Sequence, residues 1–205
     1  MENESFFVNK KFHLLLGITG SVAAIKTTIL LDSVTQAFPR CKVRVVITEN
    51  SKPFIDYETL KSRVKVHEDM DEWQKWKKLG DTVLHIKLRS WADILVVAPL
   101  DATTLAKLAN GLCDNLLSCI ARAWDFKKPF LYAPAMNTFM WEHPITVKHT
   151  TILESFGYKQ ISPVTKKLAC SETGLGAMAE VSTIISEIKE VLLKKNLVNF
   201  DLNYC

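Results

Sequence analysis

The sequence predicts one α/β domain in which a parallel sheet carries helices on both faces, the doubly wound arrangement. Two observations predict this class. Continuous apolar stretches at 12–18, 93–98 and 129–133 suit strands buried on both faces, and helical patterns alternate with them. A length of 205 residues, with 48% apolar and 23% charged residues, fits one globular domain. We expect a single domain over 1–205, with its core over about 11–195 and a flexible tail over about 196–205.

The first third of the chain reads as strand, helix, strand. The strand over 12–18 ends in the tight turn Thr19-Gly20-Ser21, and apolar residues at helical spacing predict a helix over 22–38 that Pro39 ends. A β-branched run at 43–47 predicts the second strand. The more polar middle predicts a short surface helix over 73–78 and then a turn at 80–81.

The alternation resumes at residue 93. The expected elements are a strand over 93–98, a helix over 103–110 that stops at Gly111, a helix over 114–124, a strand over 129–133, a helix over 146–156, a short strand over 158–161, a loop over 162–176 and a closing helix marked by apolar residues from 184 to 192. Ligands of such sheets bind beyond the carboxyl ends of the strands. The loops after Ile18, Ile47, Ala98 and Ala133 are therefore the candidate binding loops.

Charge, cysteine content and the amino terminus exclude several classes. The net charge of +4 comes from dispersed lysines, which is weak evidence for a nucleic-acid partner. Five cysteines without C-x-x-C spacing favour reduced thiols and no metal site. Residues 1–11 are too charged for a signal peptide, and the apolar run 14–25 is too short to span a membrane. We expect a cytoplasmic protein with no membrane partner.

The first candidate loop, residues 17–24, places glycine, serine and backbone N–H groups at the start of a helix. Such a helix terminus attracts anions. The loop lacks both G-x-G-x-x-G and a Walker lysine, so it favours a single phosphate over a dinucleotide or a nucleoside triphosphate. The alternative is a plain tight turn with Ser21 as the helix cap.

The last candidate loop, residues 133–144, has an unusual composition. Two methionines and a tryptophan could line a pocket for a flat ring, and Asn137 would offer a donor and an acceptor. The alternative is that these large side chains only fill core space.

Five segments together resemble a known family. They are 20–24 (GSVAA), 98–104 (APLDATT), 114–117 (DNLL), 134–141 (PAMNTFMW) and 170–180 (CSETGLGAMAE). In combination they resemble the homo-oligomeric flavin-containing cysteine decarboxylases, and the resemblance extends over roughly 11–195.

The resemblance implies a Rossmann-like, flavodoxin-like fold and FMN as cofactor. It implies decarboxylation of 4′-phosphopantothenoyl-L-cysteine to 4′-phosphopantetheine and CO₂ in coenzyme A biosynthesis. In that chemistry the flavin oxidises the substrate thiol to a thioaldehyde, CO₂ leaves, and the resulting enethiol is reduced.

The resemblance also assigns catalytic roles to three residues. His85 acts during thiol oxidation and decarboxylation, Asn137 holds the substrate carboxylate, and Cys170 protonates the enethiol. Without the resemblance, a lone His85 or Cys170 would be interpreted as a packing residue. The implied FMN contacts are Gly20, Ser21, Val22, Thr48, Ser51, Asp101, Ala102, Thr103, Thr104 and Ala135. The chain departs from the family pattern at Thr103, a shorter partner for the flavin, and at Ser171 and Glu172 in the flap; none of these departures removes a catalytic group.

The implied assembly is a homotrimer with FMN between subunits and His85 contributed across the interface. Apolar residues at Trp91, 112–117 and Trp124 would supply interface area, unless they fill the core. Gly174 and Gly176 are expected to be hinges of a closing flap, and Cys113 and Cys119 to be packing residues. The alternative functions are a phosphatase-inhibiting regulator of the same fold, a peptidyl-cysteine decarboxylase and a flavin prenyltransferase; the combination of His85, Asn137 and Cys170 favours the enzyme over the regulator.

Overall fold

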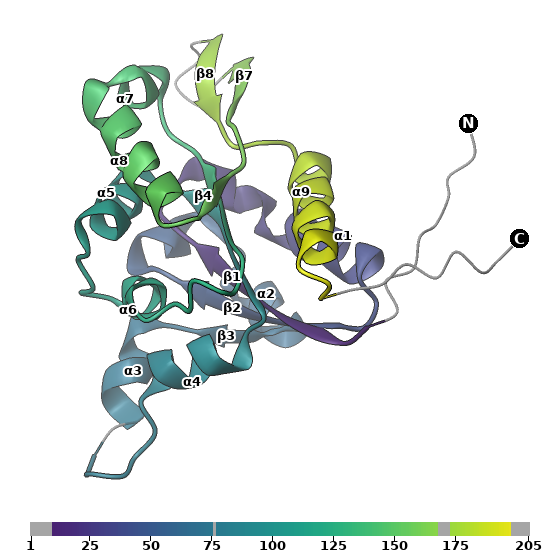
Figure 1. Cartoon of the computed structure of the whole chain (residues 1–205), viewed down its shortest axis with the longest axis vertical. Helices are drawn as coiled ribbons and strands as arrows, with labels where there is room; N and C mark the ends of the chain where they lie inside the picture. Colours follow the sequence, from purple (N-terminus) through teal and green to yellow (C-terminus); the bar gives the residue numbers. More distant parts are fainter. Residues whose placement is uncertain (1–9, 76, 168–172, 198–205) are drawn as a thin grey trace, which may run out of the picture.

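Six parallel strands form the centre of the molecule (Figure 1), whose computed structural model describes residues 10–75, 77–167 and 173–197. The strands are β1 (Phe12–Ile18), β2 (Cys41–Ile47), β3 (Lys65–His67), β4 (Ile94–Leu100), β5 (Phe130–Pro134) and β6 (Lys159–Gln160). Their order in the sheet is β3-β2-β1-β4-β5-β6. The chain moves outward from β1 to β3 and then outward from β4 to β6, so the winding reverses between β1 and β4. This confirms the doubly wound, Rossmann-like fold class, for which a binding crevice is expected between those two strands.

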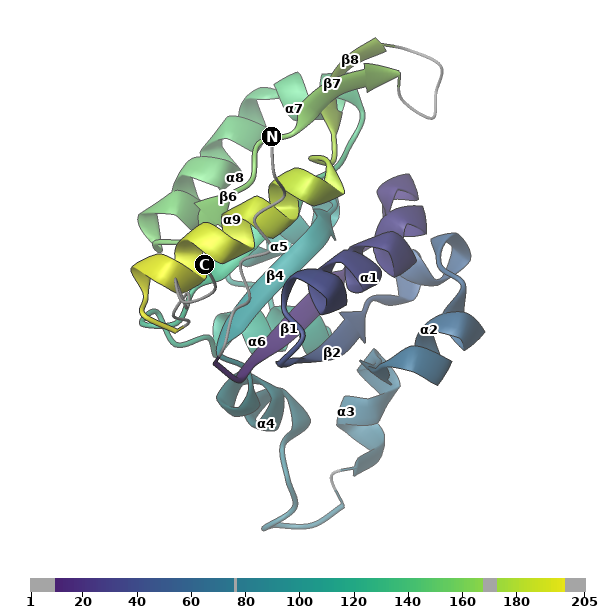
Figure 2. The ribbon, with the colours of Figure 1, turned by 90° about the vertical axis from the view of Figure 1, so that its right-hand side faces the viewer.

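Helices cover both faces of this sheet. They are the 3₁₀ helices η1 (Val22–Lys26) and η2 (Glu49–Phe54), and α1 (Thr27–Ala37), α2 (Tyr57–Arg63), α3 (Asp69–Lys75), α4 (Leu84–Trp91), α5 (Ala102–Asn110), α6 (Leu116–Arg122), α7 (Thr138–Glu142), α8 (Pro144–Ser155) and α9 (Val181–Lys194). Figure 2 shows α1 and α9 together on one face, with α5 and α6 behind the sheet and α4 at its lower end. Leu84 and Leu88 of α4 belong to the hydrophobic core of the same face as α5 and α6.

Each face of the sheet has its own hydrophobic core, which explains why the central strands are apolar throughout. Leu14 and Leu16 of β1 pack against α1 and α9 on one face, whereas Leu15 packs with α4, α5 and α6 on the other. All seven residues of β4 are buried. A strand covered on both sides has no solvent-facing position for a polar residue.

Three local expectations differ from the structure. The helix expected over 22–38 begins with the 3₁₀ turn η1, where the Ala24 N–H donates to the Ser21 carbonyl three residues back at 2.9 Å and the Ser21 hydroxyl accepts from the Ala23 N–H. The helix expected over 114–124 starts only at Leu116, after a capping box between Asn115 and Ser118. The short edge elements η2, α2 and β3 lie in the polar middle, where we expected no strand.

The expectation of a loop over 162–176 is wrong. Strands β7 (Val164–Lys167) and β8 (Thr173–Ala177) form an antiparallel hairpin that is separate from the main sheet. The segment 168–172 between them lies outside the described residues, as does most of the expected tail, 198–205.

The apolar residues that we assigned to an interface are mostly core residues. Leu116, Leu117 and Trp124 are buried, and the Trp124 indole N–H donates to the Lys128 carbonyl. Leu112 remains exposed. In the described parts of the chain, no helix has both the length and the hydropathy to cross a bilayer.

Candidate active site

The loops after β1 and β4 are hydrogen-bonded to each other where the sheet reverses direction. The Thr19 hydroxyl donates to the Pro99 carbonyl at 2.9 Å and accepts from the Asp101 N–H at 2.7 Å. Asp101 then bridges the two loops, since its carboxylate accepts from the Gly20 N–H at 3.1 Å and from the Thr104 N–H at 2.6 Å. The two loops therefore form one rigid unit at the crevice.

The loop after β2 closes on the same unit. A β-carbon on Gly20 would lie 2.6 Å from the Asn50 β-carbon and 3.0 Å from its carbonyl oxygen, so only glycine permits this approach. Ser51 is fully buried and its hydroxyl donates to the Thr48 carbonyl at 2.7 Å. These two hydroxyl residues hold the loop in shape.

The expected flavin contacts therefore divide into two groups. Accessible residues surround the loop mouths: Gly20, Ser21, Val22, Asp101, Ala102 and Thr103. Buried residues support the loops from below: Thr48, Ser51, Thr104 and Ala135. The starts of η1 and α5 are joined through Gly20 and Asp101, and backbone N–H groups at helix starts fit an anionic group such as the phosphate of FMN.

Asn137 lies after β5, at the same edge of the sheet. It caps α7, and its side-chain oxygen accepts from the Phe139 N–H at 2.9 Å. The hairpin packs directly on this segment, because the Met136 N–H donates to the Gly176 carbonyl at 2.9 Å. Gly176 has φ of +142°, and a β-carbon there would lie 2.5 Å from the Met136 carbonyl oxygen. Gly174 and Gly176 thus allow close packing of β8 against residues 136–138, within a strand and not in a loop.

His85 forms a tight pair with Glu72, a residue that the sequence reasoning missed. The His85 ring nitrogen Nδ1 lies 2.6 Å from one carboxylate oxygen of Glu72, and the His85 backbone N–H donates to the other oxygen at 2.9 Å. Glu72 is only 9% exposed. It lies on α3, thirteen residues away in a polar segment without a motif, so no sequence signal pointed to it.

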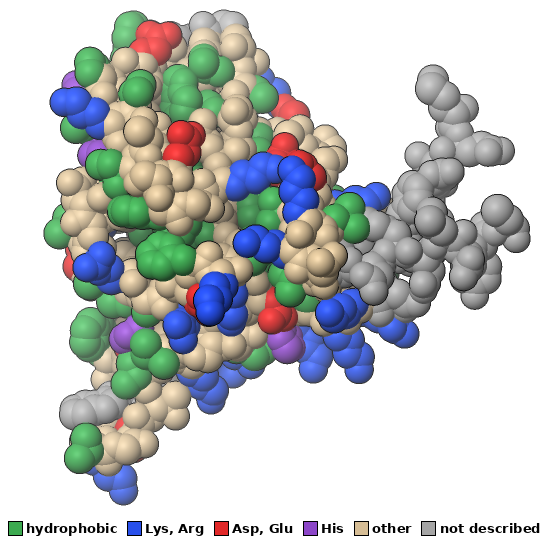
Figure 3. Space-filling view, in the orientation of Figure 1, with side chains coloured by type: hydrophobic (Ala, Val, Ile, Leu, Met, Phe, Trp, Pro, Cys, Tyr) green, Lys and Arg blue, Asp and Glu red, His purple; other side chains and the backbone are tan. Residues whose placement is uncertain are grey.

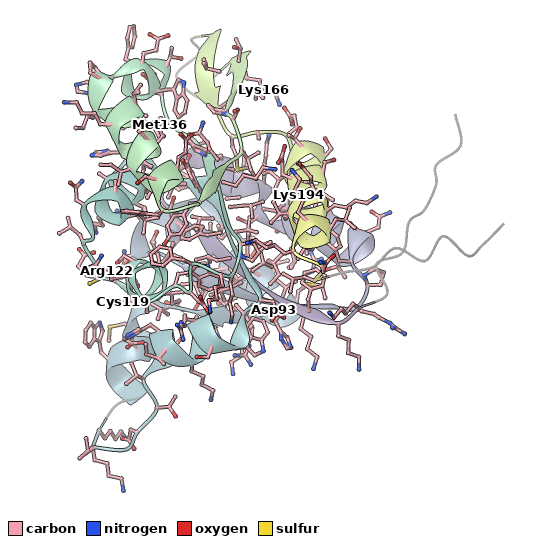
Figure 4. The ribbon with its side chains drawn as sticks, in the orientation of Figure 1. Asp93, Cys119, Arg122, Met136, Lys166 and Lys194 are labelled. Carbon is pink, nitrogen blue, oxygen red and sulfur yellow. The ribbon has the colours of Figure 1, made fainter. Side chains whose placement is uncertain are left out.

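The chain does not bring His85 and Asn137 together. Figures 1 and 2 show α4, which carries His85, at the opposite end of the molecule from α7 and the hairpin. Figure 4 shows the same separation, with Met136 and Lys166 at one end and Cys119 and Asp93 toward the other. The expected site is therefore divided between two regions of one chain.

Exposed apolar side chains lie on the elements that carry each half of the site. Met70 and Trp73 of α3 and Ile86 of α4 are exposed near the Glu72–His85 pair. Phe139 and Met140 of α7 are exposed beside Asn137. Figure 3 shows hydrophobic side chains at the surface over both regions. Such groups are typical of surfaces that meet another chain.

A cavity of about 340 Å³ lies away from the candidate loops. It is lined by Arg44, Lys65, His67, Asp81, Thr82, Leu84 and Lys87. These residues come from β2, β3, α4 and the segment before α4, so this cavity is not the cofactor site that the sequence predicts.

The cysteines and the remaining histidines have distinct surroundings. Cys170 lies outside the described residues. Cys113 is exposed, which contradicts its expected packing role, whereas burial is the main cause that raises the pKa of Cys119 to about 11.

The other histidines have structural positions: His13 contacts Trp91 and Asp93, His67 and His149 are buried, and His143 caps α8.

Nearly the whole chain, including these loops, is similar to proteins of one family. The Flavoprotein family model matches residues 3–193. Phosphopantothenoylcysteine decarboxylase of Mus musculus is 52% identical over 183 residues, which cover 89% of this chain and 88% of the relative. A solved PPC decarboxylase, a cysteine-to-serine mutant complexed with pantothenoylaminoethenethiol, is 49% identical with a TM-score of 0.86 and covers 90% of this chain and 100% of its own. The FMN binding protein AtHal3 is 49% identical with a TM-score of 0.83, covering 90% and 98%.

Proposed function

The chain belongs to the Flavoprotein family, and we propose that it decarboxylates 4′-phosphopantothenoyl-L-cysteine to 4′-phosphopantetheine and CO₂ with FMN. The observation that carries the function is 52% identity over 89% of the chain to a decarboxylase of this substrate. The protein is an enzyme of coenzyme A biosynthesis. The first test is the visible spectrum of the purified protein: a bound flavin spectrum is expected, and its absence after reconstitution with FMN would favour the regulatory alternative.

The residues at the switch point fit FMN. The Gly20–Ser21–Val22 turn and the first turn of α5 at Asp101–Thr104 would hold it, with Ala135 below them and with Thr48 and Ser51 fixing the neighbouring loop. When bound, FMN supplies the hydride acceptor and donor that this reaction requires. The protein contributes backbone N–H donors at the helix starts. It also contributes a close approach between the loops at Gly20 and Asn50 that only glycine allows at position 20.

Three side chains of this protein would act on the substrate. The Asn137 amide donor suits a carboxylate without adding a charge, and its oxygen is already held by the Phe139 N–H. His85 would take a proton during the first half of the reaction. Cys170 would return a proton in the second half, a role supported by the relative whose cysteine-to-serine mutant was solved with an enethiol.

The roles of His85 and Cys170 differ in the product that each variant accumulates. Cys170→Ser should release CO₂ and accumulate an enethiol, because a serine hydroxyl is a far weaker acid than a thiol. His85→Asn should release no CO₂. Saturated phosphopantetheine formed by Cys170→Ser at the wild-type rate, or enethiol accumulated by His85→Asn, would contradict these assignments.

We propose further that the active site is shared between chains of a homotrimer. The separation of α4 from α7 supports this, as do the exposed apolar residues on both. The measurement is activity after mixing His85→Asn with Cys170→Ser chains, since mixed trimers would contain some sites with both wild-type residues. Partial recovery is expected, and full activity of a sedimenting monomer would refute sharing. We also propose that residues 1–205 act as one flavoprotein domain in the cytoplasm.

A further inference from the structure

We propose that Glu72 is the positioning residue that fixes His85 in the Nδ1–H tautomer, so that Nε2 is the nitrogen that exchanges protons with the substrate. This inference rests on the proposed function, because it takes His85 as the base. It names a residue of α3 that no motif indicates.

Glu72 is a buried carboxylate whose oxygens both contact His85. A carboxylate that is 9% exposed is costly unless its oxygens are hydrogen-bonded. Both of its oxygens contact one residue, His85: one accepts from the backbone N–H at 2.9 Å and the other lies 2.6 Å from Nδ1. The carboxylate thus binds both the backbone and the ring of His85, which fixes the position and the orientation of the imidazole.

Glu72 also supplies a hydrogen-bond acceptor at the start of α4. The N–H groups in the first turn of a helix have no partner within the helix. Val83, the N-cap residue, has an apolar side chain that cannot supply one, and His85 is the second residue of the helix. Glu72 therefore acts as a cap from a neighbouring helix, which anchors the end of α4 that carries the base.

The contact with Glu72 also determines the tautomer of His85. A neutral imidazole has one donor nitrogen and one acceptor nitrogen, and an ionised carboxylate can only accept. A contact of 2.6 Å between Nδ1 and the carboxylate therefore places the hydrogen on Nδ1. Nε2 is left as the acceptor. His85 is partly exposed, with a side-chain exposure of 25%, so the ring remains accessible for a substrate or a second chain.

The variant Glu72→Gln separates positioning from capping. The amide oxygen of glutamine can still accept from the His85 N–H, but its NH₂ group would then face Nδ1. A donor opposite Nδ1 favours the Nε2–H tautomer, which removes the basic nitrogen from the substrate side. Loss of a comparable tautomer in a catalytic triad lowers kcat by about 10⁴. We expect a fall in kcat of at least about 100-fold with KM changed by less than about threefold.

Asp69 provides a matched control on the same helix. Its carboxylate accepts from the Leu116 N–H at 2.9 Å and so caps α6 in the way that Glu72 caps α4, without a histidine ring. Asp69→Asn removes the same charge and retains a capping oxygen. Its kcat should stay within about threefold of wild type.

The direct readout is ¹⁵N NMR of histidine-labelled, flavin-bound protein, with the His85 signals identified by their absence in His85→Asn. We expect Nδ1–H in the wild type and Nε2–H in Glu72→Gln. Unchanged tautomer and kcat in Glu72→Gln, or an equal loss of kcat in Asp69→Asn, would overturn the proposal. The tautomer is measured without turnover, so a wild-type protein inactive on the substrate would refute the proposed function and leave this test readable.

Discussion

Replacing Gly176 with alanine should undock the β7–β8 hairpin from the Asn137 segment. A β-carbon at this position would lie 2.5 Å from the Met136 carbonyl oxygen, which belongs to the backbone and cannot rotate away. The backbone angle φ of +142° is also one that residues with a side chain rarely adopt. Movement of β8 away from residues 136–138 would relieve this strain, because β8 is outside the main sheet.

The magnitude follows from two separate costs. A residue with a side chain in such a conformation costs about 1–3 kcal/mol. The overlap with the Met136 carbonyl adds about 1–3 kcal/mol, the usual penalty for overpacking. Together they amount to about 2–6 kcal/mol acting against hairpin docking. Since about 1.4 kcal/mol is a tenfold change in rate, kcat/KM should fall at least about tenfold if docking of β8 holds the Asn137 segment in its catalytic position.

Gly157→Ala is the matched control for this assay. Gly157 also has a positive φ, +82°, but among the described atoms nothing lies within 4 Å of a β-carbon built there. It carries the conformational cost without the overlap. Both variants should retain the flavin spectrum, and only Gly176→Ala should lose kcat/KM on phosphopantothenoylcysteine. Full activity of Gly176→Ala, or an equal loss in Gly157→Ala, would refute the role given to the docked hairpin.

Three further predictions concern the cofactor loop, the thiols and pH. Gly20→Ala should lower the flavin bound per chain, measured by absorbance, because the new β-carbon would lie 2.6 Å from that of Asn50; unchanged occupancy would contradict the packing argument. Exposed Cys113 should react with a thiol reagent well before Cys41, whose pKa is raised by burial to about 12, and Cys113→Ser should lower the number of fast-reacting thiols by one. Hydrogen bonds from Lys159 and Lys194 lower the pKa of Glu190 from 4.5 to about 2. The contribution of Glu190 to the free energy of unfolding is therefore present above pH 4.5 and is lost as the pH falls through 2. The difference in unfolding midpoint between the wild type and Glu190→Gln, measured against pH, should disappear over the same range.

The central sheet could be predicted because strands that are buried on both faces appear in the sequence as continuous apolar runs. Strands β1, β4 and β5 lie within about two residues of their expected ranges, since their neighbours allow no polar position. The edge strand β3 was missed because it has three residues and only one neighbour, β2. The hairpin was missed because docking onto residues 136–138 holds it, and such long-range contacts leave no periodic pattern in glycine- and lysine-rich sequence.

The candidate site was predictable only where a motif carried it. The loops around Gly20 and Asp101 do meet at the switch point, as parallel topology requires. Glu72 could not be found, because its pairing with His85 depends on how α3 packs beside α4. The interface assignment of Leu116 and Trp124 was wrong, since amphipathic spacing cannot distinguish a helix face that covers a sheet from one that covers another chain.

The proposed decarboxylation is tested most directly by measuring CO₂ release from 4′-phosphopantothenoyl-L-cysteine by the purified flavin-bound protein. The measurement would follow labelled CO₂ and 4′-phosphopantetheine together, with a peptide ending in cysteine as the competing substrate. We expect both products to form in equal amounts from the phosphorylated substrate and the peptide not to be decarboxylated. No release from that substrate by protein fully loaded with FMN, or release only from the peptide, would contradict it.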